Sequence, residues 1–378
     1  MGDDLTGAAV PTPAGADVLI LGGGPAGAAT ACTLASAGAS VVLVERSSYE
    51  SVRVGETFPP VIARALARLQ LSEFIDEALH VPSYGVRSLW GGDEPHERSF
   101  VFDAYGHGWH VDRRAFDAAL AFAAEQRGVR VLRQTRLISC ERDAGAGWKI
   151  RMAAPGSVVE TRARFVVDAT GRASALARRL GGSRVACDQL VGVYRYYSPA
   201  PRGAADATHD AFTLIEADER GWWYSAPLPA GRFVVAFMTD ADLCQRDGRR
   251  RPEQPPFAPR TRERATRYAP EGECRLVSAN NSRAEPVSGR DWLAVGDAAV
   301  AFDPLSGDGV LRALEWGPRA ARAVLRAIDG DTSELEEYAG RLRDEWEVYR
   351  DRQRAFYARE TRWPASTFWA RRREPRRS

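Results

Sequence analysis

The chain has 378 residues, of which 44% are hydrophobic, so it can bury a sizeable core and its length predicts two closely associated domains. A formal net charge of +2, from 52 basic and 50 acidic residues, gives no global field that would favour nucleic acid or an anionic membrane as a partner. There is no run of about 18 apolar residues and no signal-peptide pattern, so we expect a cytoplasmic protein.

The sequence gives no sign of a metal site or a disulfide framework. Its five cysteines are scattered, odd in number and never in a C-x-x-C pair, and free thiols fit a reducing compartment. His107 and His110 are spaced like a ligand pair, but they flank a glycine just before a predicted helix. We expect ordinary packing or solvation there and no bound metal.

The N-terminal part reads as a β-α-β unit. Residues 17–22 (DVLILG) form a short apolar run, which predicts a buried strand. This run leads into the turn GGPAG and an alanine-rich helical pattern ending at Gly38, and residues 40–45 (SVVLVE) predict a second strand. In such a unit a glycine-rich turn is typical of dinucleotide binding.

The turn itself fits the pattern G-x-G-x-x-G. Gly22 permits the tight turn, Gly24 lets a pyrophosphate approach the backbone, and Gly27 allows the helix to pack closely on the strand. The pyrophosphate is expected at the helix N-terminus, beside Pro25 and Ala26.

An acidic residue completes this pattern. Glu45 ends the second predicted strand, where it can accept hydrogen bonds from a ribose. With strand, helix and acid in register, the sequence predicts dinucleotide binding. We include Arg46 and Arg53 among the cofactor-binding residues.

Periodicity and capping signals predict further elements along the chain. They are a helix over 59–80, a helix over 112–127 with Asp112 as N-cap, short strands between 129 and 168, a largely antiparallel sheet from 184 to 285 with a loop-like insertion around 245–260, a buried strand in DWLAV, and a helix over 307–328. Pro318 should kink or restart that last helix. The tail from 331 to 372 reads as helical, and the basic residues 371–377 as a solvated end.

A second glycine-rich segment, VGDAAVAFDPLSGDGV, follows the DWLAV strand. It resembles the second flavin-contacting motif of the FAD-dependent hydroxylases, in which the aspartate bonds the ribityl chain and a helix N-terminus faces the flavin ring. The residues that the resemblance assigns to FAD here are Gly296, Asp297, Pro304, Gly307, Gly309 and Val310.

Two further marks fit the same superfamily. Arg113, in VDRRAFDAAL, matches the R-x-x-[FL]-D arginine that reaches the flavin phosphates or ribityl chain, and Asp168, in VVDATGRAS, matches the D-x-x-G strand end. The resemblance runs from Asp17 to the C-terminus and implies FAD as cofactor. It also implies an α/β fold with a Rossmann-type FAD-binding domain of the glutathione-reductase/hydroxylase type (14–183 and 286–330), an antiparallel-sheet substrate domain (184–285) and a C-terminal helical segment (331–378).

Within that superfamily, RVGETFPP resembles the G-E-x-x-P loop of the halogenase-like branch, but three departures disfavour halogenation. Halogenases need a lysine in the tunnel between flavin and substrate, and the only lysine here, Lys149, lies in a predicted strand of the FAD domain. Their W-x-W-x-I-P is altered to Trp222, Tyr224, Ala226 and Pro227. Their F-x-x-P-x-x-S-x-G has lost its Phe and Ser, which are replaced by Ala301 and Gly307.

The chain more closely resembles flavoproteins that hydroxylate a tryptophan within a partner protein during maturation of cysteine tryptophylquinone enzymes. GETFPP, GWWYSAPLP, FDPLSGDG and TRWPASTFWARR carry this resemblance. It implies oxygen transfer from a flavin hydroperoxide to an aromatic ring, with a quinoprotein oxidase or dehydrogenase subunit as protein substrate. No second G-x-G-x-x-G is present, so NAD(P)H must bind transiently or a separate flavin reductase must supply electrons to FAD, and molecular oxygen is the oxidant.

Other functions stay open on the sequence alone. They are a hydroxylase or halogenase of a small aromatic natural product, a flavin-dependent isoprenoid reductase, and a flavin-holding chaperone without turnover.

The candidate catalytic residues are Glu56 and Asp303, as base or polar anchor, and Tyr224 as a hydrogen-bond donor. The alternative roles are that Glu56 braces its loop and that Asp303 caps the following helix. Strand alternation places Trp222, Tyr224 and Ala226 on one face, which we expect to border the substrate cavity, and Trp223 on the other.

Overall fold

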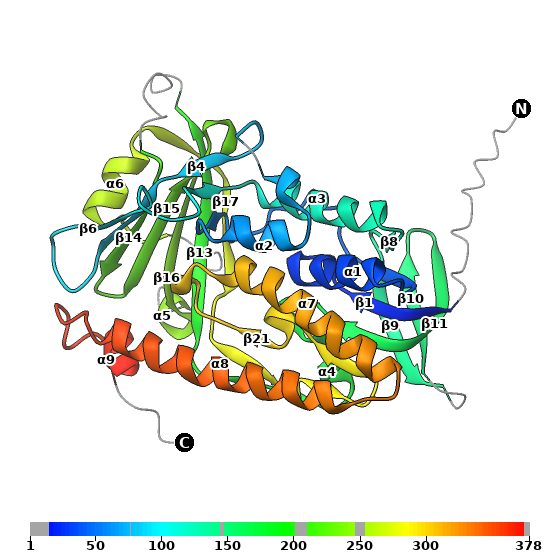
Figure 1. Ribbon diagram of the computed structural model, residues 1–378. Coiled ribbons are helices and arrows are strands. Elements are labelled where there is room, and N and C mark those ends of the chain that lie inside the picture. Colours follow the sequence, from blue (N-terminus) through cyan, green and yellow to red (C-terminus); the bar gives the residue numbers. More distant parts are fainter. Residues whose placement is uncertain (1–14, 76, 144–146, 201–209, 246–253, 374–378) are drawn as a thin grey trace, which may run out of the picture.

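A computed structural model describes residues 15–75, 77–143, 147–200, 210–245 and 254–373. Two sheets lie at opposite ends of the molecule, and the long helix α8 (Ser333–Tyr357) runs beneath both (Figure 1). One end is a layered α/β unit and the other a large antiparallel sheet. This arrangement confirms the predicted fold class.

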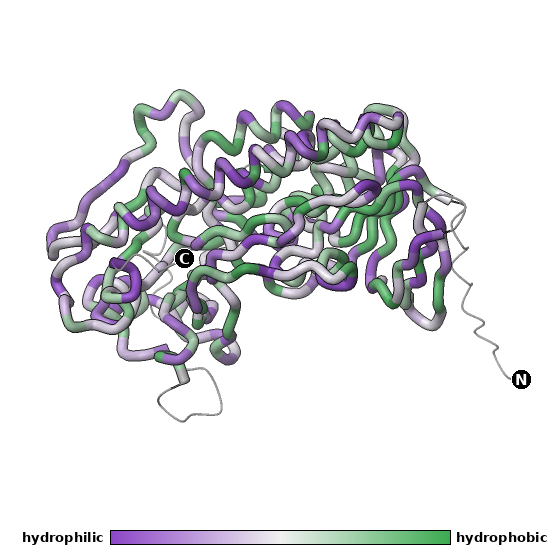
Figure 2. The backbone as a smooth tube through the Cα atoms, turned by 90° about the horizontal axis from the view of Figure 1, so that it is seen from below, coloured by the Kyte–Doolittle hydropathy of each residue, from purple (hydrophilic) through white to green (hydrophobic). Residues whose placement is uncertain are grey.

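The first sheet has the strand order β19-β20-β11-β1-β2-β8, in which β20, β11, β1, β2 and β8 are parallel and β19 pairs antiparallel with β20. An antiparallel β9-β10 extension pairs with β11. Its described strands are β1 (Ala16–Leu21), β2 (Val41–Val44), β8 (Arg130–Leu132), β9 (Arg136–Arg142), β10 (Trp148–Ala154), β11 (Ser157–Asp168), β19 (Ser288–Gly289) and β20 (Trp292–Ala294). β1, β2 and β20 are apolar runs, and all but one of their residues are buried, as expected for strands covered on both faces. Figure 2 shows hydrophobic residues gathered on these strands.

Helices α1 (Pro25–Ser36), α3 (Arg113–Gln126) and α7 (Gly309–Ile328) pack around this sheet. At Gly317, a Cβ atom would lie 2.6 Å from the Cβ of Ala29, so the glycine allows α7 to cross α1 closely. The expectation that Pro318 restarts the helix is wrong, because α7 is a single helix through that position. Asp112 caps α3 as predicted, and its carboxylate accepts the Arg114 N–H.

The helix predicted over 59–80 is too long. It is reduced to α2 (Ile62–Arg68) and the short 3₁₀ turn η1 (Ser72–Phe74). Gln70 adopts the left-handed conformation at φ +55°, which ends the helical path, and β4 begins at Val81.

The second sheet has the strand order β17-β13-β16-β15-β14-β5-β6 and is antiparallel except for the parallel pair β14 and β5. Its described strands are β5 (Gly85–Leu89), β6 (His96–Ser99), β13 (Leu190–Pro199), β14 (Phe212–Asp218), β15 (Gly221–Pro227), β16 (Phe233–Asp240) and β17 (Tyr268–Ser278). The predicted antiparallel sheet is therefore confirmed. It also takes two strands from residues 85–99, far upstream in the sequence.

Two small sheets and short helices join the units. Their bounds are β3 (Thr57–Phe58), β4 (Val81–Ser83) and β7 (Gly108–His110) in one sheet, β12 (Ser183–Ala186), β18 (Ser282–Glu285) and β21 (Val300–Ala301) in the other, with helices α4 (Ala175–Arg179), α5 (Ala241–Gln245) and α6 (Pro259–Ala265). The loop before β3, residues 52–56, contacts both units, because Arg53 pairs with Glu45 after β2 while Val52 and Val54 pack against the core of the second sheet.

The C-terminal helices α8 and α9 (Thr367–Arg373) close the structure. The expectation of a solvated basic end is wrong for Arg372, whose side chain is 9% exposed, whereas Arg371 is exposed as predicted. Both form ion pairs with the buried Asp240, Arg371 at 2.9 Å and Arg372 at 2.7 Å, and Arg371 also pairs with Asp242 at 2.8 Å. Residues 374–377 of that basic run lie outside the described part of the chain.

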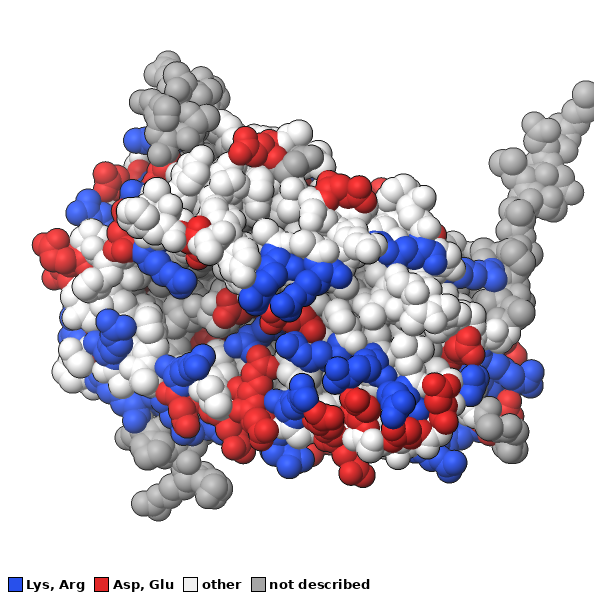
Figure 3. Space-filling model, in the orientation of Figure 1, with Lys and Arg blue, Asp and Glu red and all other residues white. Residues whose placement is uncertain are grey.

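Acidic and basic side chains alternate along α8 on the face seen in Figure 3, so this helix presents a mixed-charge surface. A search of the described residues for a helix long and apolar enough to span a bilayer finds no candidate.

Candidate functional site

The predicted pyrophosphate turn has the geometry that its glycines allow. Gly22 is left-handed at φ +108°, and a Cβ there would collide with the Ala169 carbonyl. A Cβ at Gly27 would collide with the Gly22 carbonyl, so helix and strand touch at this point. At Gly24 the opposite holds, because no heavy atom lies within 4 Å of the position a Cβ would take. The open space is therefore beside Gly24, at the start of α1.

The N-terminus of α1 is suited to an anion. Gly24 is its N-cap and supplies no side chain, Pro25 is its first residue, and the first turn carries no acidic residue. The amides there have no side-chain cap, and the helix dipole favours negative charge. These residues fit the pyrophosphate of a dinucleotide.

The second glycine segment lies against the first. Gly296 is left-handed at φ +61°, and a Cβ there would lie 2.7 Å from the Cβ of Ala26. Further along, neither Gly307 nor Gly309 would bring a Cβ within 4 Å of another heavy atom. Open space therefore borders the start of α7, as it borders α1.

Three more residues of the second glycine segment were predicted to contact FAD. Asp297 is part-exposed and lies 3.5 Å from the Arg172 guanidinium. Pro304 starts a 3₁₀ turn, and Val310 lies in the first turn of α7. Contact of each of these residues with FAD stays a prediction.

Glu45 is buried at the end of β2. Its Oε2 accepts the Gly23 N–H at 2.9 Å and its Oε1 accepts the Ser47 N–H at 2.9 Å. Burial acts to raise the pKa of Glu45, but Ser47 and Arg53 outweigh it, so the pKa is lowered. Glu45 is therefore an ionised acceptor next to the glycine turn. Arg46, which follows it, is exposed.

A buried carboxylate that we did not single out in the sequence joins the predicted arginines. Asp117, fully buried, accepts from Arg53 Nη1 at 2.8 Å and from Arg113 Nε at 3.0 Å. Arg53 also contacts Glu45 at 3.0 Å, and Arg113 donates to the Val54 carbonyl at 2.7 Å. Asp117 is the aspartate of R-x-x-F-D, so the motif itself was the signal that could have identified it.

Asp168 is used by the backbone of its own turn. Its carboxylate accepts the Thr170 N–H at 3.0 Å, the Leu176 N–H at 2.8 Å and the Ala177 N–H at 3.2 Å. The Thr170 hydroxyl adds a fourth bond at 2.6 Å. Asp168 therefore shapes the turn after β11, and its direct contact with FAD stays a prediction.

The predicted alternation on β15 is confirmed. Trp222 and Ala226 pack on one face of the sheet with Tyr224, whereas Trp223 packs on the other against Phe237, with ring centroids 4.6 Å apart. Across the sheet Tyr224 and Ala226 are in register with Ala236 and Val234 of β16, which pair in turn with Tyr194 and Tyr196 of β13.

Trp222 is covered by the C-terminal segment. Only 1% of its surface is exposed, and its indole N–H donates to the Tyr357 hydroxyl at 3.0 Å. Trp90 lies against it, at 6.4 Å between ring centroids. Ala226 is also fully buried, so Tyr224 is the one of these three that keeps exposed surface. Substrate contacts for Trp222 and Ala226 stay predictions.

Glu56 is the buried acid of this face. Its Oε2 accepts the Gly55 N–H at 2.8 Å, and its Oε1 accepts a very short hydrogen bond from the Tyr196 hydroxyl. Burial raises the pKa of Glu56, and the bonds from Tyr196 and Gly55 only partly offset this. Sequence reasoning missed Tyr196; its signal was the alternation of VGVYRYY, which sends Tyr194 and Tyr196 to one face.

Asp303 has the geometry of a capping residue. Its carboxylate accepts the Leu305 N–H at 2.9 Å, the Tyr357 hydroxyl at 2.7 Å and a Gln353 N–H at 2.9 Å. Burial raises the pKa of Asp303. With three protein donors in place, the alternative that Asp303 caps its turn fits the contacts better than a role as base.

Tyr224 reaches a second set of polar groups. Its hydroxyl lies 2.7 Å from Thr57 Oγ1, and that oxygen lies 3.1 Å from His110 Nδ1. His110 Nε2 lies 3.2 Å from the Ala211 carbonyl oxygen. Burial lowers the pKa of His110 to about 4, so its imidazole is neutral at physiological pH. No group of three or more metal-ligating side chains occurs among the described residues.

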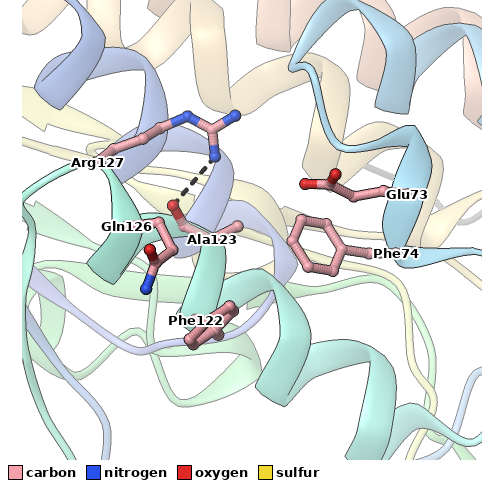
Figure 4. Close-up of a pocket in the computed structure, with 6 residues that line it drawn as sticks. All are labelled: Glu73, Phe74, Phe122, Ala123, Gln126 and Arg127. Atoms are coloured by element: carbon pink, nitrogen blue, oxygen red, sulfur yellow. Dashed lines mark hydrogen bonds between the residues drawn. The ribbon is translucent and has the colours of Figure 1, made fainter.

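A small cavity lies beside Glu56. The residues that line it include Arg53, Arg113, Tyr196, Leu228 and Pro229. A separate surface hollow lies between η1 and α3, where Phe122 is half exposed (Figure 4). No predicted site residue lines that hollow, whereas the predicted residues Arg53, Glu56 and Arg113 line the cavity beside Glu56.

Comparison with known proteins decides the family. The sequence family described as FAD binding domain matches residues 15–338. The chain belongs to the halogenase-like branch of the FAD-dependent monooxygenase superfamily. As a member of this group it is an FAD-dependent oxidoreductase, and the prediction of FAD is confirmed.

Its relatives include the FAD-dependent oxidoreductase LodB of Marinomonas mediterranea, 31% identical over 368 residues that cover 94% of this chain and 96% of LodB. The myxobacterial chondrochloren halogenase CndH matches with a TM-score of 0.83 at 26% identity, over 96% of this chain and 87% of CndH. The peptidyl tryptophan dihydroxylase QhpG, essential for tryptophylquinone cofactor biogenesis, matches with a TM-score of 0.67 at 25% identity, over 95% of this chain and 78% of QhpG.

Replacing Gly24 with valine should remove FAD without unfolding the protein. The added side chain meets no protein atom within 4 Å and the backbone there is extended, so it would fill only the space assigned to the pyrophosphate. We expect the purified variant to lose its yellow flavin absorbance while its thermal unfolding stays cooperative. Gly92→Val, at another open glycine, is the matched control. Full flavin occupancy in Gly24→Val would overturn the assignment.

His110 should make stability depend on pH. The unfolded chain binds a proton on His110 below about 6.5, whereas the folded chain does so only below about 4, so stability falls as the pH falls between these values. Arg264 opposes protonation and Asp210 favours it, but burial is the largest cause.

Urea titrations should show the wild type losing about 3 kcal/mol more than His110→Gln over this window. His107→Gln, at a part-exposed histidine three residues earlier, should behave like the wild type. Parallel pH dependence of wild type and His110→Gln would contradict the prediction.

Proposed function

We propose that this protein hydroxylates a tryptophan side chain in a partner protein during quinone cofactor maturation. The observation that carries the proposal is the composition of one face of the second sheet. There Tyr224 lies on the same face as Tyr196, which donates a hydrogen bond to Glu56, and no lysine lies on that face. The only lysine of the chain, Lys149, lies on β10 of the other sheet, half exposed and 3.6 Å from Glu160. The similarity to QhpG supports the same function.

FAD, when reduced, supplies the activation of molecular oxygen. The protein supplies placement and water exclusion: an aromatic ring that meets Tyr224 lies on a face whose neighbouring side chains, Trp222, Ala226 and Ala236, are all buried. NAD(P)H or a separate flavin reductase supplies the electrons in this proposal.

Glu56 is the base in this proposal. When a ring carbon has accepted oxygen, it must lose its proton to restore aromaticity. The Glu56 carboxylate takes that proton, and the Tyr196 hydroxyl and Gly55 N–H hold the carboxylate in place. Its raised pKa makes it a stronger base than an exposed carboxylate, which suits proton removal near neutral pH.

Co-expression with a quinoprotein oxidase or dehydrogenase subunit tests this function. Peptide mass spectrometry should find added oxygen on one tryptophan of the subunit only when the wild-type protein is present. We expect Glu56→Gln to lower the rate by about 10²- to 10⁴-fold. The control Glu50→Gln, at an exposed acid six residues earlier, should keep the wild-type rate.

If the tryptophan stays unmodified in every co-expressed subunit, the proposal is wrong. If free aromatic molecules were then hydroxylated, the protein would be a small-molecule hydroxylase, and if they were chlorinated or brominated it would be a halogenase.

A further inference from the structure

We propose that Tyr224 presents a hydrogen-bond acceptor to the substrate, so that the site selects an aromatic ring carrying an N–H or O–H donor, as an indole does. The inference rests on the proposed function, because it names the chemistry of the ring that this site receives. It comes from the direction of a hydrogen-bond chain that ends at a backbone carbonyl.

The Ala211 carbonyl fixes the first step of the chain. A carbonyl oxygen only accepts hydrogen bonds, and it lies 3.2 Å from His110 Nε2. The proton of the neutral imidazole must therefore be on Nε2, which leaves Nδ1 with a lone pair. His110 is fully buried, and burial disfavours the doubly protonated ring that would reverse this assignment.

The tautomer of His110 then fixes the direction of the Thr57 hydroxyl proton. Its Oγ1 lies 3.1 Å from Nδ1, which can only accept, so the single hydroxyl proton of Thr57 points at the histidine. Thr57 Oγ1 has no second proton to donate. Toward Tyr224, at 2.7 Å, it must accept, and the Thr213 hydroxyl, at 3.4 Å, also donates to it.

Thr57 in turn fixes the direction of the Tyr224 phenol proton. The phenol proton is directed at Thr57, and burial, with the nearby Glu56, holds the pKa of Tyr224 far above neutrality, so that this proton stays in place. What the phenol oxygen offers to anything else is a lone pair. Tyr224 keeps some exposed surface, whereas Trp222 and Ala226 of the same strand face are buried, so in this proposal an incoming ring meets the Tyr224 lone pair.

In this proposal Tyr224 donates its proton to Thr57 and accepts from the substrate, in place of the predicted donation to the substrate. A substrate ring that brings its own N–H or O–H completes the chain from Tyr224 to Ala211. A ring without a donor leaves the Tyr224 oxygen unpaired in a buried site, which we expect to weaken binding about tenfold.

Raman spectroscopy tests the direction of the chain without any ligand. The tyrosine Fermi doublet reports whether a phenol donates or accepts a strong hydrogen bond, and the difference spectrum between wild type and Tyr224→Phe isolates this residue. We expect the ratio of a donating phenol. When both proteins also carry Thr57→Val, the difference spectrum should no longer show the ratio of a donating phenol. A doublet typical of an accepting phenol in the wild type would overturn the inference.

Binding to the oxidised holoenzyme tests the selectivity. The probes are N-acetyltryptophanamide and its benzothiophene analogue, in which sulfur replaces the ring N–H, and both are followed by the perturbation of FAD absorbance. The wild type should bind the indole about tenfold more tightly, and Tyr224→Phe should abolish the difference. Trp223→Phe, on the opposite face of the same strand, should keep it.

Equal affinity for the two probes, or a preference for the benzothiophene, would overturn the selectivity, whereas the Raman result stands even if neither small probe binds. Hydroxylation of a partner tryptophan without any N–H preference would leave the proposed function intact and remove this inference. An N–H preference without hydroxylation would do the reverse.

Discussion

The site depends on one buried carboxylate, Asp117. It holds the guanidinium groups of Arg53 and Arg113, which in turn contact Glu45 beside the glycine turn and the carbonyl of Val54 in the loop before β3. Removing one partner of such a buried network leaves an uncompensated charge, which costs about 3 to 5 kcal/mol. Asp117 therefore joins the dinucleotide turn, α3 and the Glu56 loop into one unit.

The C-terminal segment covers the face of the second sheet that carries Trp222. Tyr357 bridges Trp222 and Asp303, so the end of α8 contacts both the tryptophan of the sheet and the turn before α7. Arg372 and Asp240 fasten α9 to β16. These contacts exclude water from Trp222 and leave Tyr224 as the part-exposed aromatic residue of the GWWYSAPLP strand.

Local patterns in the sequence were enough for the glycine turns, the Asp112 cap and the alternation of β15, because each depends on neighbouring residues. Long-range contacts were not predictable. Such contacts join residues 50 or more positions apart. They are the pairing of β5 with β14, the ion pair of Arg372 with Asp240, and the hydrogen bonds of Thr57 with His110 and Tyr224. The proposed direction of the Tyr224 hydroxyl group depends on the same kind of contact, since it follows from the Ala211 carbonyl through His110 and Thr57.

A crystal structure of the protein with bound FAD is the most direct test of whether the two glycine segments and the tyrosine face serve one cofactor. The pyrophosphate should lie beside Gly24, and the flavin ring should lie between the start of α7 and the Glu56 loop, with its reactive edge toward Tyr224. A flavin whose ring points away from the second sheet, with Tyr224 and Glu56 out of reach, would contradict this arrangement.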